Sequence, residues 1–366
     1  MDPVRIGLIG CGNISAAYLR AAAAYFPDIA VVACADLDES RARARAEEFG
    51  LHATSVDALL ADPAVEIVLN LTVPQAHVLV GLDAVRHGKH VHCEKPLGAS
   101  TTEARILLQA ADAAGLRVGV APDTFLGGAH QTARRLLDEG AIGRPLSGTA
   151  FMMNHGHEHW HPDPGFYYAP GGGPMFDMGP YYLTNLVNLL GPVARVTGFA
   201  TSGFDRRTVT SAPKRGTVLD VGVATHVSGL MQFVSGAVVS IATSFDVWQH
   251  RHGNMELYGT EGSMVVPDPN RFGGTVSLAK GREAWADIPL SHGYADGNFR
   301  AIGLVDMARA LRAGRPHRCD GALGFHVLQV MEAFGESSES GRFVEIESRC
   351  ERPAPLPAWP VAGQLD

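Results

Sequence analysis

Cysteine is scarce in this sequence. Only five occur in 366 residues, scattered and mostly inside apolar runs: Cys11, Cys34, Cys93, Cys319 and Cys350. An odd number without CxxC spacing argues against a disulfide framework and against a cysteine-rich metal site. Because the pattern fits a reducing compartment, we expect a cytoplasmic protein.

The sequence also lacks any block of lysine and arginine and any long apolar run. Its formal net charge of −8 argues against nucleic acid or an anionic membrane as the partner. No run of about 18 apolar residues suggests a membrane-spanning helix, and no apolar signal segment precedes the glycines near residue 10. We therefore expect a small-molecule ligand, with neither nucleic acid nor a membrane as a partner.

The pattern of apolar residues changes near residue 125, and the length of the chain favours two domains. In residues 1–125, β-rich runs alternate with alanine-rich helical segments. Strands are expected at 4–10, 29–36, 65–71, 90–95 and 117–122, and helices at 14–24, 39–48, 75–87 and 101–114. A capping-box pattern at 100–103 opens the last of these helices. Strict alternation predicts βαβ units in a doubly wound parallel sheet.

Residues 126–366 carry longer strand candidates separated by glycine-containing turns. A helical segment at 131–140 comes first, strand-like runs follow at 217–229, 230–248 and 254–266, and helical segments at 298–313 and 322–338 come last. These runs are typical of hairpins in a largely antiparallel sheet. The predicted fold class is α/β, with a parallel sheet followed by a mostly antiparallel one.

A glycine-rich turn, GCGNIS at 10–15, follows the first predicted strand and opens a predicted helix. Its glycines permit a tight turn and the close approach of a pyrophosphate to backbone N–H groups at a helix N-terminus. Ser15 stands where the usual fingerprint has a third glycine, and a small residue nearly fulfils that packing role. The residues predicted to bind a dinucleotide here are Gly10, Gly12, Asn13 and Ile14.

Asp36 ends the second predicted strand. A carboxylate at that place can accept hydrogen bonds from both ribose hydroxyls and would repel a 2′-phosphate. NAD is therefore favoured as the cofactor over NADP. Two alternatives stay open: Asp36 could be an acid of a surface turn, and Arg41 could tolerate a phosphate.

A polar stripe runs along an otherwise apolar helix predicted after the glycine run at 171–173. It consists of Asp177, Tyr181, Asn185 and Asn188, at spacings of four, four and three, which share one helix face. One interpretation is structural: Asp177 caps the helix, Pro180 is tolerated in its first turn, and the stripe faces solvent or another subunit. The other is that its N-terminal end faces a substrate.

Four segments together resemble those of the Gfo/Idh/MocA family, named after glucose-fructose oxidoreductase, inositol dehydrogenase and MocA. They are the glycine-rich turn, NLTVPQAH at 70–77, HCEKP at 92–96 and GGGPMFDMGPYY at 171–182. The resemblance implies a Rossmann domain that binds NAD, here residues 1–125. It also implies a substrate domain, here 126–366, whose large open sheet usually supports homodimers or homotetramers. The implied activity is that of an NAD-dependent oxidoreductase.

The resemblance also implies roles for individual residues. The cofactor contacts it adds are Thr72, Pro74, His77, Glu94 and Lys95. Lys95 would reach the substrate as well. The family's catalytic helix commonly carries an aspartate and, four residues later, a histidine, whereas some of its sugar oxidoreductases have tyrosine there. The implied catalytic residues of this chain are Lys95, Asp177 and Tyr181.

These residue types suit the oxidation of a secondary alcohol. A hydride leaves the carbon while the hydroxyl proton passes to a base within hydrogen-bond reach. A phenol serves as such a base when a neighbouring ammonium stabilises its phenolate, and Lys95 is the candidate neighbour of Tyr181. Asp177 would hold either Lys95 or a sugar hydroxyl. The alternative is a purely structural role, in which Lys95 is a lysine at a strand-end turn before proline.

Aromatic residues beside acids and imidazoles occur in WHPDPGFYY at 160–168 and FDVWQHRH at 245–252. Flat rings beside hydrogen-bonding groups suit a pyranose, although burial in a core explains them equally well. The turn APDTFLGG at 121–128 replaces an Arg- or Asn-bearing turn usual in the family. The predicted substrate contacts are Asp123, Thr124, Trp160, His161, Tyr167 and Trp248.

Four histidines alternate in the segment NHGHEHWH: His155, His157, His159 and His161. On a strand they would share one face, and imidazole is a good zinc ligand. However, prolines at 162 and 164 indicate a loop, no cysteine lies near, and hydride transfer to nicotinamide needs no metal. No metal site is therefore predicted.

Three functions follow from these residues. The first is an NAD-dependent dehydrogenase acting on a secondary hydroxyl of a sugar, glycoside or polyol. The second is a glycoside-cleaving enzyme in which NAD transiently oxidises the sugar, elimination breaks the bond and the hydride returns. The third is a cofactor-sensing regulator without chemistry, against which the presence of Lys95, Asp177 and Tyr181 argues.

Overall fold

The computed structural model describes residues 2–358 and 365. Its contacts divide the chain into two units. The first comprises Met1–Gly128, Ser291–Leu328 and Pro353–Asp366, and the second comprises Ala129–Leu290 and Gln329–Arg352. The first boundary lies close to residue 125, but the second unit is not the continuous segment 126–366 that the sequence suggests, because later segments return to the first unit.

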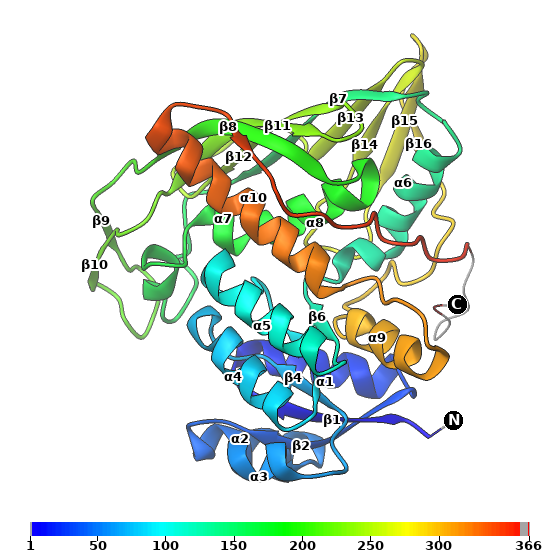
Figure 1. Cartoon of the computed structure of the whole chain (residues 1–366). Helices are drawn as coiled ribbons and strands as arrows, with labels where there is room; N and C mark the ends of the chain where they lie inside the picture. The colour runs from blue at the N-terminus through cyan, green and yellow to red at the C-terminus, as the bar shows by residue number, and fades with distance from the viewer. Residues whose placement is uncertain (1, 359–364, 366) are drawn as a thin grey trace. The chain divides into compact units, whose positions relative to one another are not determined.

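A six-stranded parallel sheet is the centre of the first unit (Figure 1). Its order is β3-β2-β1-β4-β5-β6. The strands are β1 Val4–Ile9, β2 Ile29–Ala35, β3 His52–Ala53, β4 Ile67–Asn70, β5 His90–Cys93 and β6 Val118–Val120. Every pair in this sheet is parallel, which confirms the predicted doubly wound arrangement.

Helices alternate with these strands. They are α1 Asn13–Tyr25, α2 Glu39–Phe49, α3 Val56–Ala61, α4 Pro74–Arg86 and α5 Thr101–Ala113, and the 3₁₀ turn η1 Thr124–Leu126 follows β6. From the central strand β1, the strands β2 and β3 are added towards one edge of the sheet, and β4, β5 and β6 are added towards the other edge. Right-handed crossovers therefore put α1 and α2 on one face and α4 and α5 on the other. The Ser100 side chain caps α5 by accepting from the Glu103 N–H at 3.3 Å, as the sequence predicted.

Two later helices complete the first unit: α9 Ile302–Ala313 and the beginning of α10 Gly321–Ser340. Arg309 of α9 forms an ion pair with Asp28 at 2.8 Å, and a β-bridge joins Gly119 of β6 to Asp320. These contacts link positions 281 and 201 (320 − 119) residues apart. Local sequence patterns carry no signal for pairings at that separation, which is why the return was not predicted.

A nine-stranded sheet is the centre of the second unit, in the order β16-β15-β14-β13-β7-β12-β11-β8-β17. Its strands are β7 Pro145–Met153, β8 Val193–Thr201, β11 His226–Phe233, β12 Val238–Ser244, β13 Met255–Gly259, β14 Gly262–Val266, β15 Val276–Lys280, β16 Ala286–Ile288 and β17 Val344–Glu345. Only β7 and β12 pair in parallel within this sheet. The predicted mostly antiparallel sheet is confirmed.

The predicted strand limits between 217 and 248 are wrong in one respect. The division at 229/230 falls inside β11, and the turn to β12 lies at Gly236, whose φ is +91°. The first residues of this stretch belong instead to β10 Val218–Asp220, which pairs with β9 Arg206–Thr208 in a separate two-stranded ribbon.

Helices pack against one face of the nine-stranded sheet. They are α6 Gly128–Asp138, α7 Pro174–Asp177, α8 Gly179–Leu190 and the later part of α10, and the 3₁₀ turn η2 Gly165–Tyr168 precedes α7. Gly198 of β8 and Gly229 of β11 are direct partners. A Cβ on either would lie within 3.0 Å of the Phe334 ring of α10, so the two glycines make room for that ring.

The opposite face of the sheet is partly exposed. The register pairs Phe199 with Ser228 and Leu230 with Thr197, so both large apolar side chains lie on the same face. Phe199 is 71% exposed and Leu230 is 43% exposed. This face therefore leaves apolar surface uncovered within one chain.

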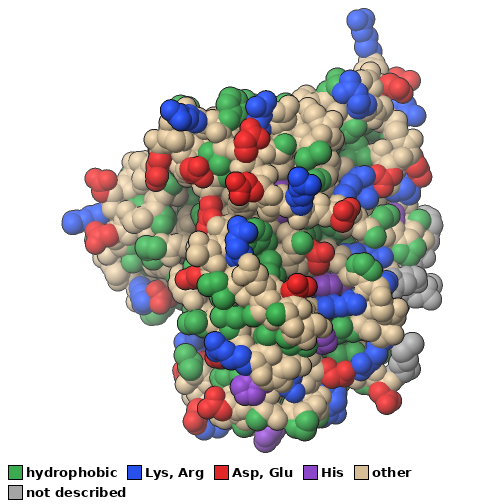
Figure 2. All heavy atoms as spheres, viewed as in Figure 1, with side chains coloured by type: hydrophobic (Ala, Val, Ile, Leu, Met, Phe, Trp, Pro, Cys, Tyr) green, Lys and Arg blue, Asp and Glu red, His purple; other side chains and the backbone are tan. Residues whose placement is uncertain are grey.

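Charged side chains of both signs are interspersed on the face shown in Figure 2. That face offers no continuous basic surface of the kind that follows a phosphate backbone. Within residues 2–358 and 365, no helix combines the length and the apolar character needed to cross a bilayer.

His92 on β5 is fully buried, and within the described chain neither of its ring nitrogens has a hydrogen-bond partner. Burial lowers the pKa of His92 to about 3. A histidine in the unfolded chain has a pKa near 6.5, so on acidification the unfolded state takes up a proton that the folded state refuses. The stability lost through His92 therefore grows as the pH falls from about 6.5 towards about 3.

We expect His92→Phe to weaken the acid sensitivity of the first unit. Between pH 7 and pH 5 the wild type should lose about 2 kcal/mol more free energy of unfolding than the variant. Urea titrations at both pH values measure this difference. His52→Phe, at an exposed position of β3, is the control and should follow the wild type. Equal pH dependence in His92→Phe and wild type would contradict the prediction.

Candidate active site

The glycine-rich turn carries the chain from β1 to the N-terminus of α1. Gly10 has φ +100°, and a Cβ there would lie 2.6 Å from the backbone of Leu71, so only glycine fits. Gly12 precedes α1 as its N-cap, with no side-chain cap bond and no acidic residue in the first turn. Nothing lies within 4 Å of the place where a Gly12 Cβ would be. This helix N-terminus therefore suits a pyrophosphate.

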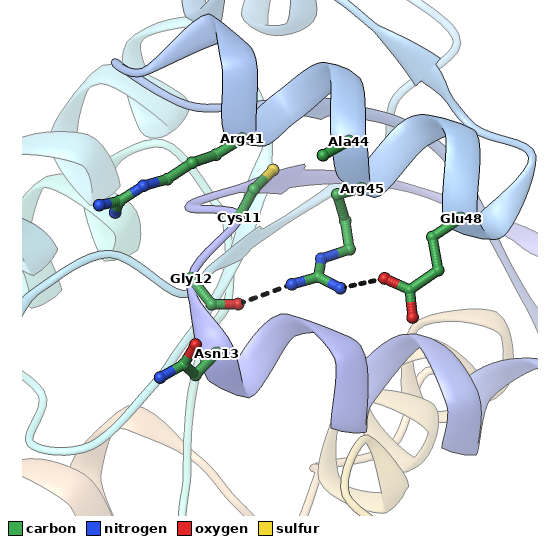
Figure 3. A pocket seen from close by; sticks show the side chains of 7 residues that line it. All are labelled: Cys11, Gly12, Asn13, Arg41, Ala44, Arg45 and Glu48. Atoms are coloured by element: carbon green, nitrogen blue, oxygen red, sulfur yellow. Dashed lines mark hydrogen bonds and ion pairs between the residues drawn. The ribbon is translucent and has the colours of Figure 1, made fainter. Parts of the chain in front are cut away.

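A hollow of about 490 Å³ lies beside this turn (Figure 3). Its lining residues are Cys11, Gly12, Asn13, Arg41, Ala44, Arg45 and Glu48. The Arg45 guanidinium donates to the carbonyl oxygen of Gly12 at 3.4 Å and pairs with the carboxylate of Glu48. The hollow thus has a wall of backbone from the turn and a wall of arginine side chains from α2.

Asp36 ties the glycine-rich turn to the end of β2. Its Oδ2 accepts from the backbone N–H of Cys11 at 2.7 Å, and its Oδ1 accepts from the N–H of Asp38 at 2.9 Å. The carboxylate therefore lies against the turn, where it can meet a ribose diol. Arg41 and Arg45 line the neighbouring hollow, so the same region also holds groups that can bind a phosphate.

His77 supports the loops after β4 and β5 from inside the protein. Its ring is fully buried, with Nδ1 2.7 Å from the carbonyl oxygen of Pro96 and Nε2 3.0 Å from that of Thr72. A neutral imidazole donates to only one of them, and burial lowers the pKa of His77 despite the two carbonyls. The side chain of Asn70 adds to this frame by accepting from the Thr72 hydroxyl at 2.7 Å. Asn70 was not among the predicted site residues.

Glu94 and Lys95 follow β5 at the carboxyl edge of the parallel sheet, where open sheets of this kind bind ligands. The carboxylate of Glu94 accepts from the Tyr18 hydroxyl at 2.8 Å and from the backbone N–H of Lys95 at 2.9 Å. Burial raises the pKa of Tyr18, so its hydroxyl stays a donor. The turn that carries Lys95 is thereby fixed from α1.

Asp123 and Thr124 are both 1% exposed. Oδ2 of Asp123 accepts from the backbone N–H groups of Ala301 and Gly303, at 3.0 and 3.1 Å, at the N-terminus of α9. Burial raises the pKa of Asp123 to about 6. The structure thus gives Asp123 a helix-capping role that the sequence did not suggest, and the substrate contacts of both residues stay predictions.

The sequence suggested that the polar stripe lies on one continuous helix. In the structure it is divided between two helices. α7 ends at Asp177, Met178 intervenes, and α8 begins at Gly179. Pro180 is in the first turn of α8, where its missing N–H is tolerated, whereas its ring would clash inside a continuous helix. The N-cap residues of the two helices are Gly173 and Met178, so the interpretation in which Asp177 caps the helix is wrong.

Asn185 and Asn188 bind α6. Both are fully buried. The amide of Asn185 lies 3.0 Å from Nδ1 of His130, and Oδ1 of Asn188 accepts from Arg134 at 3.1 Å. Burial lowers the pKa of His130 to about 4, so its neutral ring can accept from Asn185. The interpretation in which this part of the stripe faces solvent is wrong, since its partners are inside the unit.

Asp177 lies beside the loop that follows β7. Its Oδ2 is 3.3 Å from Nε2 of His157. The rings of Tyr167 and Trp160 lie 4.1 and 5.4 Å from that of His157, and the ring of His161 lies 5.4 Å from that of Tyr167. Three of the predicted substrate contacts, Trp160, His161 and Tyr167, therefore lie near Asp177 and around His157. In the sequence, His157 was recognisable only as one of four alternating histidines.

Arg207 of β9 anchors this loop. Its guanidinium is buried, pairs with Glu158 at 3.2 Å, and also binds the carboxylate of Asp246. The hydroxyl of Tyr168 donates to Glu158 at 2.7 Å. No local sequence pattern singled out Arg207, because its partners are distant in the chain.

Trp248 stacks on His155, with ring centroids 3.3 Å apart, and is 78% exposed. Its substrate contact stays a prediction. The histidine run itself lies in a loop, and its rings have different partners. Among the residues that the structure describes, no three His, Cys, Asp or Glu side chains are grouped so as to hold a metal ion.

Gly10→Ala and Gly12→Ala form a matched pair of variants. Gly10→Ala should lower the thermal stability, because its methyl group overlaps the backbone of Leu71 and the positive φ is strained. Gly12→Ala should cost less than about 1 kcal/mol but weaken NAD binding at least tenfold, because the methyl group would lie where the sequence predicts that the pyrophosphate approaches. Thermal unfolding and calorimetric titration measure the two effects. Wild-type NAD affinity in Gly12→Ala would contradict this position for the cofactor.

Comparisons with known proteins identify the family of this chain. A model described as "Oxidoreductase family, NAD-binding Rossmann fold" matches residues 4–121, and one described as "GFO/IDH/MocA C-terminal domain" matches residues 130–265. The chain is similar to 1,5-anhydro-D-fructose reductase of Ensifer adhaerens, with 26% identity over 94% of this chain and 99% of the relative. It is also similar to D-xylose 1-dehydrogenase (NADP(+)) 2 of Haloferax volcanii, with 27% identity over 86% and 91%.

A solved structure of levoglucosan dehydrogenase in complex with NADH and levoglucosan has the same fold. It aligns with a TM-score of 0.81 and 23% identity, covering 94% of this chain and 99% of that one. The two matching models share one family, and they match residues 4–121 and 130–265. This protein therefore belongs to the Gfo/Idh/MocA family and is an NAD(P)-dependent oxidoreductase with a Rossmann domain and the family's C-terminal domain.

Proposed function

We propose that the protein is an NAD-dependent dehydrogenase that acts on a secondary hydroxyl of a sugar, glycoside or polyol. The observation that carries this proposal is the setting of Asp177, a carboxylate beside a loop rich in aromatic and imidazole rings. Trp160 on that loop is 55% exposed. Sugars bind to such combinations of flat rings and hydrogen-bonding groups. The names of the relatives, which are reductases and dehydrogenases of sugars, support the same substrate class.

We assign proton transfer to Lys95, Asp177 and Tyr181. Bound nicotinamide supplies the hydride acceptor. Lys95 follows a strand of the parallel sheet at the edge where ligands bind, and Asp177 and Tyr181 flank the break between α7 and α8. In this assignment Lys95 stabilises the phenolate form of Tyr181, which takes the hydroxyl proton and becomes a neutral phenol, and Asp177 accepts a hydrogen bond from the sugar.

We propose that the cofactor is held by the turn at 10–14 and by the loops after β2, β4 and β5. The residues are Gly10, Gly12, Asn13, Ile14, Asp36, Thr72, Pro74, His77, Glu94 and Lys95. His77 acts through the carbonyl groups it contacts, because its ring is buried. NAD is preferred to NADP because Asp36 lies against the turn and its charge opposes a 2′-phosphate.

We propose that Trp160, His161 and Tyr167 contact the sugar, since they gather near Asp177. Asp123, Thr124 and Trp248 are further proposed contacts. The exposed face of the nine-stranded sheet, with Phe199 and Leu230, is the surface through which we propose a homodimer or homotetramer.

Asp36→Asn tests the cofactor preference. The variant keeps an amide oxygen that can accept from the Cys11 N–H but removes the charge that opposes a phosphate. The ratio of NADP to NAD dissociation constants should fall at least tenfold, because a charge close to the phosphate is removed. Asp38→Asn removes a neighbouring acid and is the control, with an expected change below about threefold. Equal changes in the two variants, or none in Asp36→Asn, would refute the role of Asp36.

Lys95→Ala tests the assigned chemistry. Sugars, polyols and glycosides are incubated with NAD or NADP, and both the reduced nicotinamide and the sugar products are followed. With a substrate that yields NADH, Lys95→Ala should lower turnover at least about 10²-fold, while NAD affinity changes far less, because the other residues proposed to hold the cofactor remain. Lys280→Ala, at an exposed end of β15, is the control.

Each outcome of this panel has a distinct meaning. Undiminished turnover in Lys95→Ala would exclude Lys95 from the chemistry. Sugar cleavage without net NADH would instead indicate redox-neutral glycoside cleavage. NAD binding without any product would indicate a cofactor-sensing regulator.

A further inference from the structure

His157 contacts Asp177 from a different part of the second unit. It lies in the loop after β7, and its Nε2 is 3.3 Å from Oδ2 of Asp177, at the long end of the hydrogen-bond range. The side chains of His157 and Asp177 are 10% and 16% exposed. In this partly dry setting, a hydrogen bond to a carboxylate restricts its orientation more firmly than in water.

Trp160 determines which nitrogen of His157 carries the proton. Its indole Nε1 lies 3.2 Å from Nδ1 of His157. An indole N–H is only a donor, so Nδ1 must present its lone pair. The proton of the neutral ring is then on Nε2, which donates to Asp177. A doubly protonated ring would set its Nδ1–H against the indole N–H.

Neighbouring rings hold the imidazole in this orientation. Tyr167 lies 4.1 Å from the His157 ring, and Phe245 lies 4.7 Å from it at an angle of 70°. The next residue, Glu158, is fixed by Arg207, and its carbonyl oxygen accepts from the N–H of Ser211 at 2.9 Å. Both the ring and the backbone of His157 are therefore anchored by contacts that do not involve Asp177.

We propose that His157 is a positioning residue, which Trp160 holds as the Nε2–H tautomer so that it orients the carboxylate of Asp177 towards a sugar hydroxyl. This proposal rests on the function proposed above and adds a residue and a tautomer to it. Trp160 acquires two roles, since its N–H binds His157 while its half-exposed ring face stays accessible to a ligand.

Imidazole nitrogen spectra test the tautomer directly. Long-range proton–nitrogen correlation spectra of the intact wild-type protein should show the Nε2–H pattern for His157, assigned by its disappearance in His157→Gln. Trp160→Phe keeps a ring but removes the indole N–H, so a second tautomer or the imidazolium should become populated. An Nδ1–H ring or an imidazolium in the wild type at pH 7.5 would overturn the proposal.

Kinetics test the positioning. His157→Phe keeps a ring without the donor and should lower kcat about 10²-fold, the scale expected when a reacting group is misplaced by about 1 Å. NAD affinity and the thermal midpoint should change little. His157→Gln retains an N–H that can reach Asp177 and should restore most of the lost turnover. Wild-type kcat in His157→Phe, or no rescue by His157→Gln, would overturn the proposal.

The two readouts separate this proposal from the proposed function. If no sugar, polyol or glycoside is turned over by the wild type, the dehydrogenase assignment fails. The nitrogen spectra then still decide whether His157 donates to Asp177 from Nε2, because they require no substrate.

Discussion

The buried guanidinium of Arg207 is the interaction on which the candidate sugar site depends. It joins Glu158 of the loop after β7 to Asp246 after β12, and its own strand belongs to the separate ribbon. The second carboxylate is further stabilised by the Thr225 hydroxyl at 2.6 Å. Removing either partner of a buried ion pair typically costs about 3–5 kcal/mol, because a desolvated charge is left behind. Glu158 is adjacent in sequence to His157, which contacts Asp177. The ion pair that holds Glu158 therefore also restrains the position of His157 beside Asp177.

The parallel sheet of the first unit was predictable from sequence, whereas the long-range contacts of that unit and some strand limits of the second unit were not. Strict alternation of strands and helices fixes a parallel sheet, because each crossover must cover one of its faces. Ser100 is readable as a cap because its partner is three residues away. The ion pair of Arg309 with Asp28 has no such local signature. The boundary inside β11 was misplaced because continuous apolar runs mark strands without marking the turns between them.

The candidate site shows the same limit. Periodicity correctly placed Asn185 and Asn188 on one helix face, but it could not reveal that the face meets His130 and Arg134. The glycine turn was recognisable because its chemistry is local to residues 10–15. The part played by His157 depends on Trp160 and on Asp177, which lies 20 residues away. Alternating histidines suggested a shared strand face, whereas prolines and turns give each ring its own surroundings.

The paired glycines of β8 and β11 have a consequence for how the second unit tolerates changes in chain length. Phe334 of α10 fits where Gly198 and Gly229 leave no side chain. One residue inserted earlier in this helix would rotate the ring by about 100° and advance it by about 1.5 Å. The Phe334 ring would then no longer lie against Gly198 and Gly229, and a side chain that fills this space less well would replace it. In homologous chains, the solvent-exposed residues of α10 should therefore vary freely. Insertions and deletions should be confined to the loops at its ends.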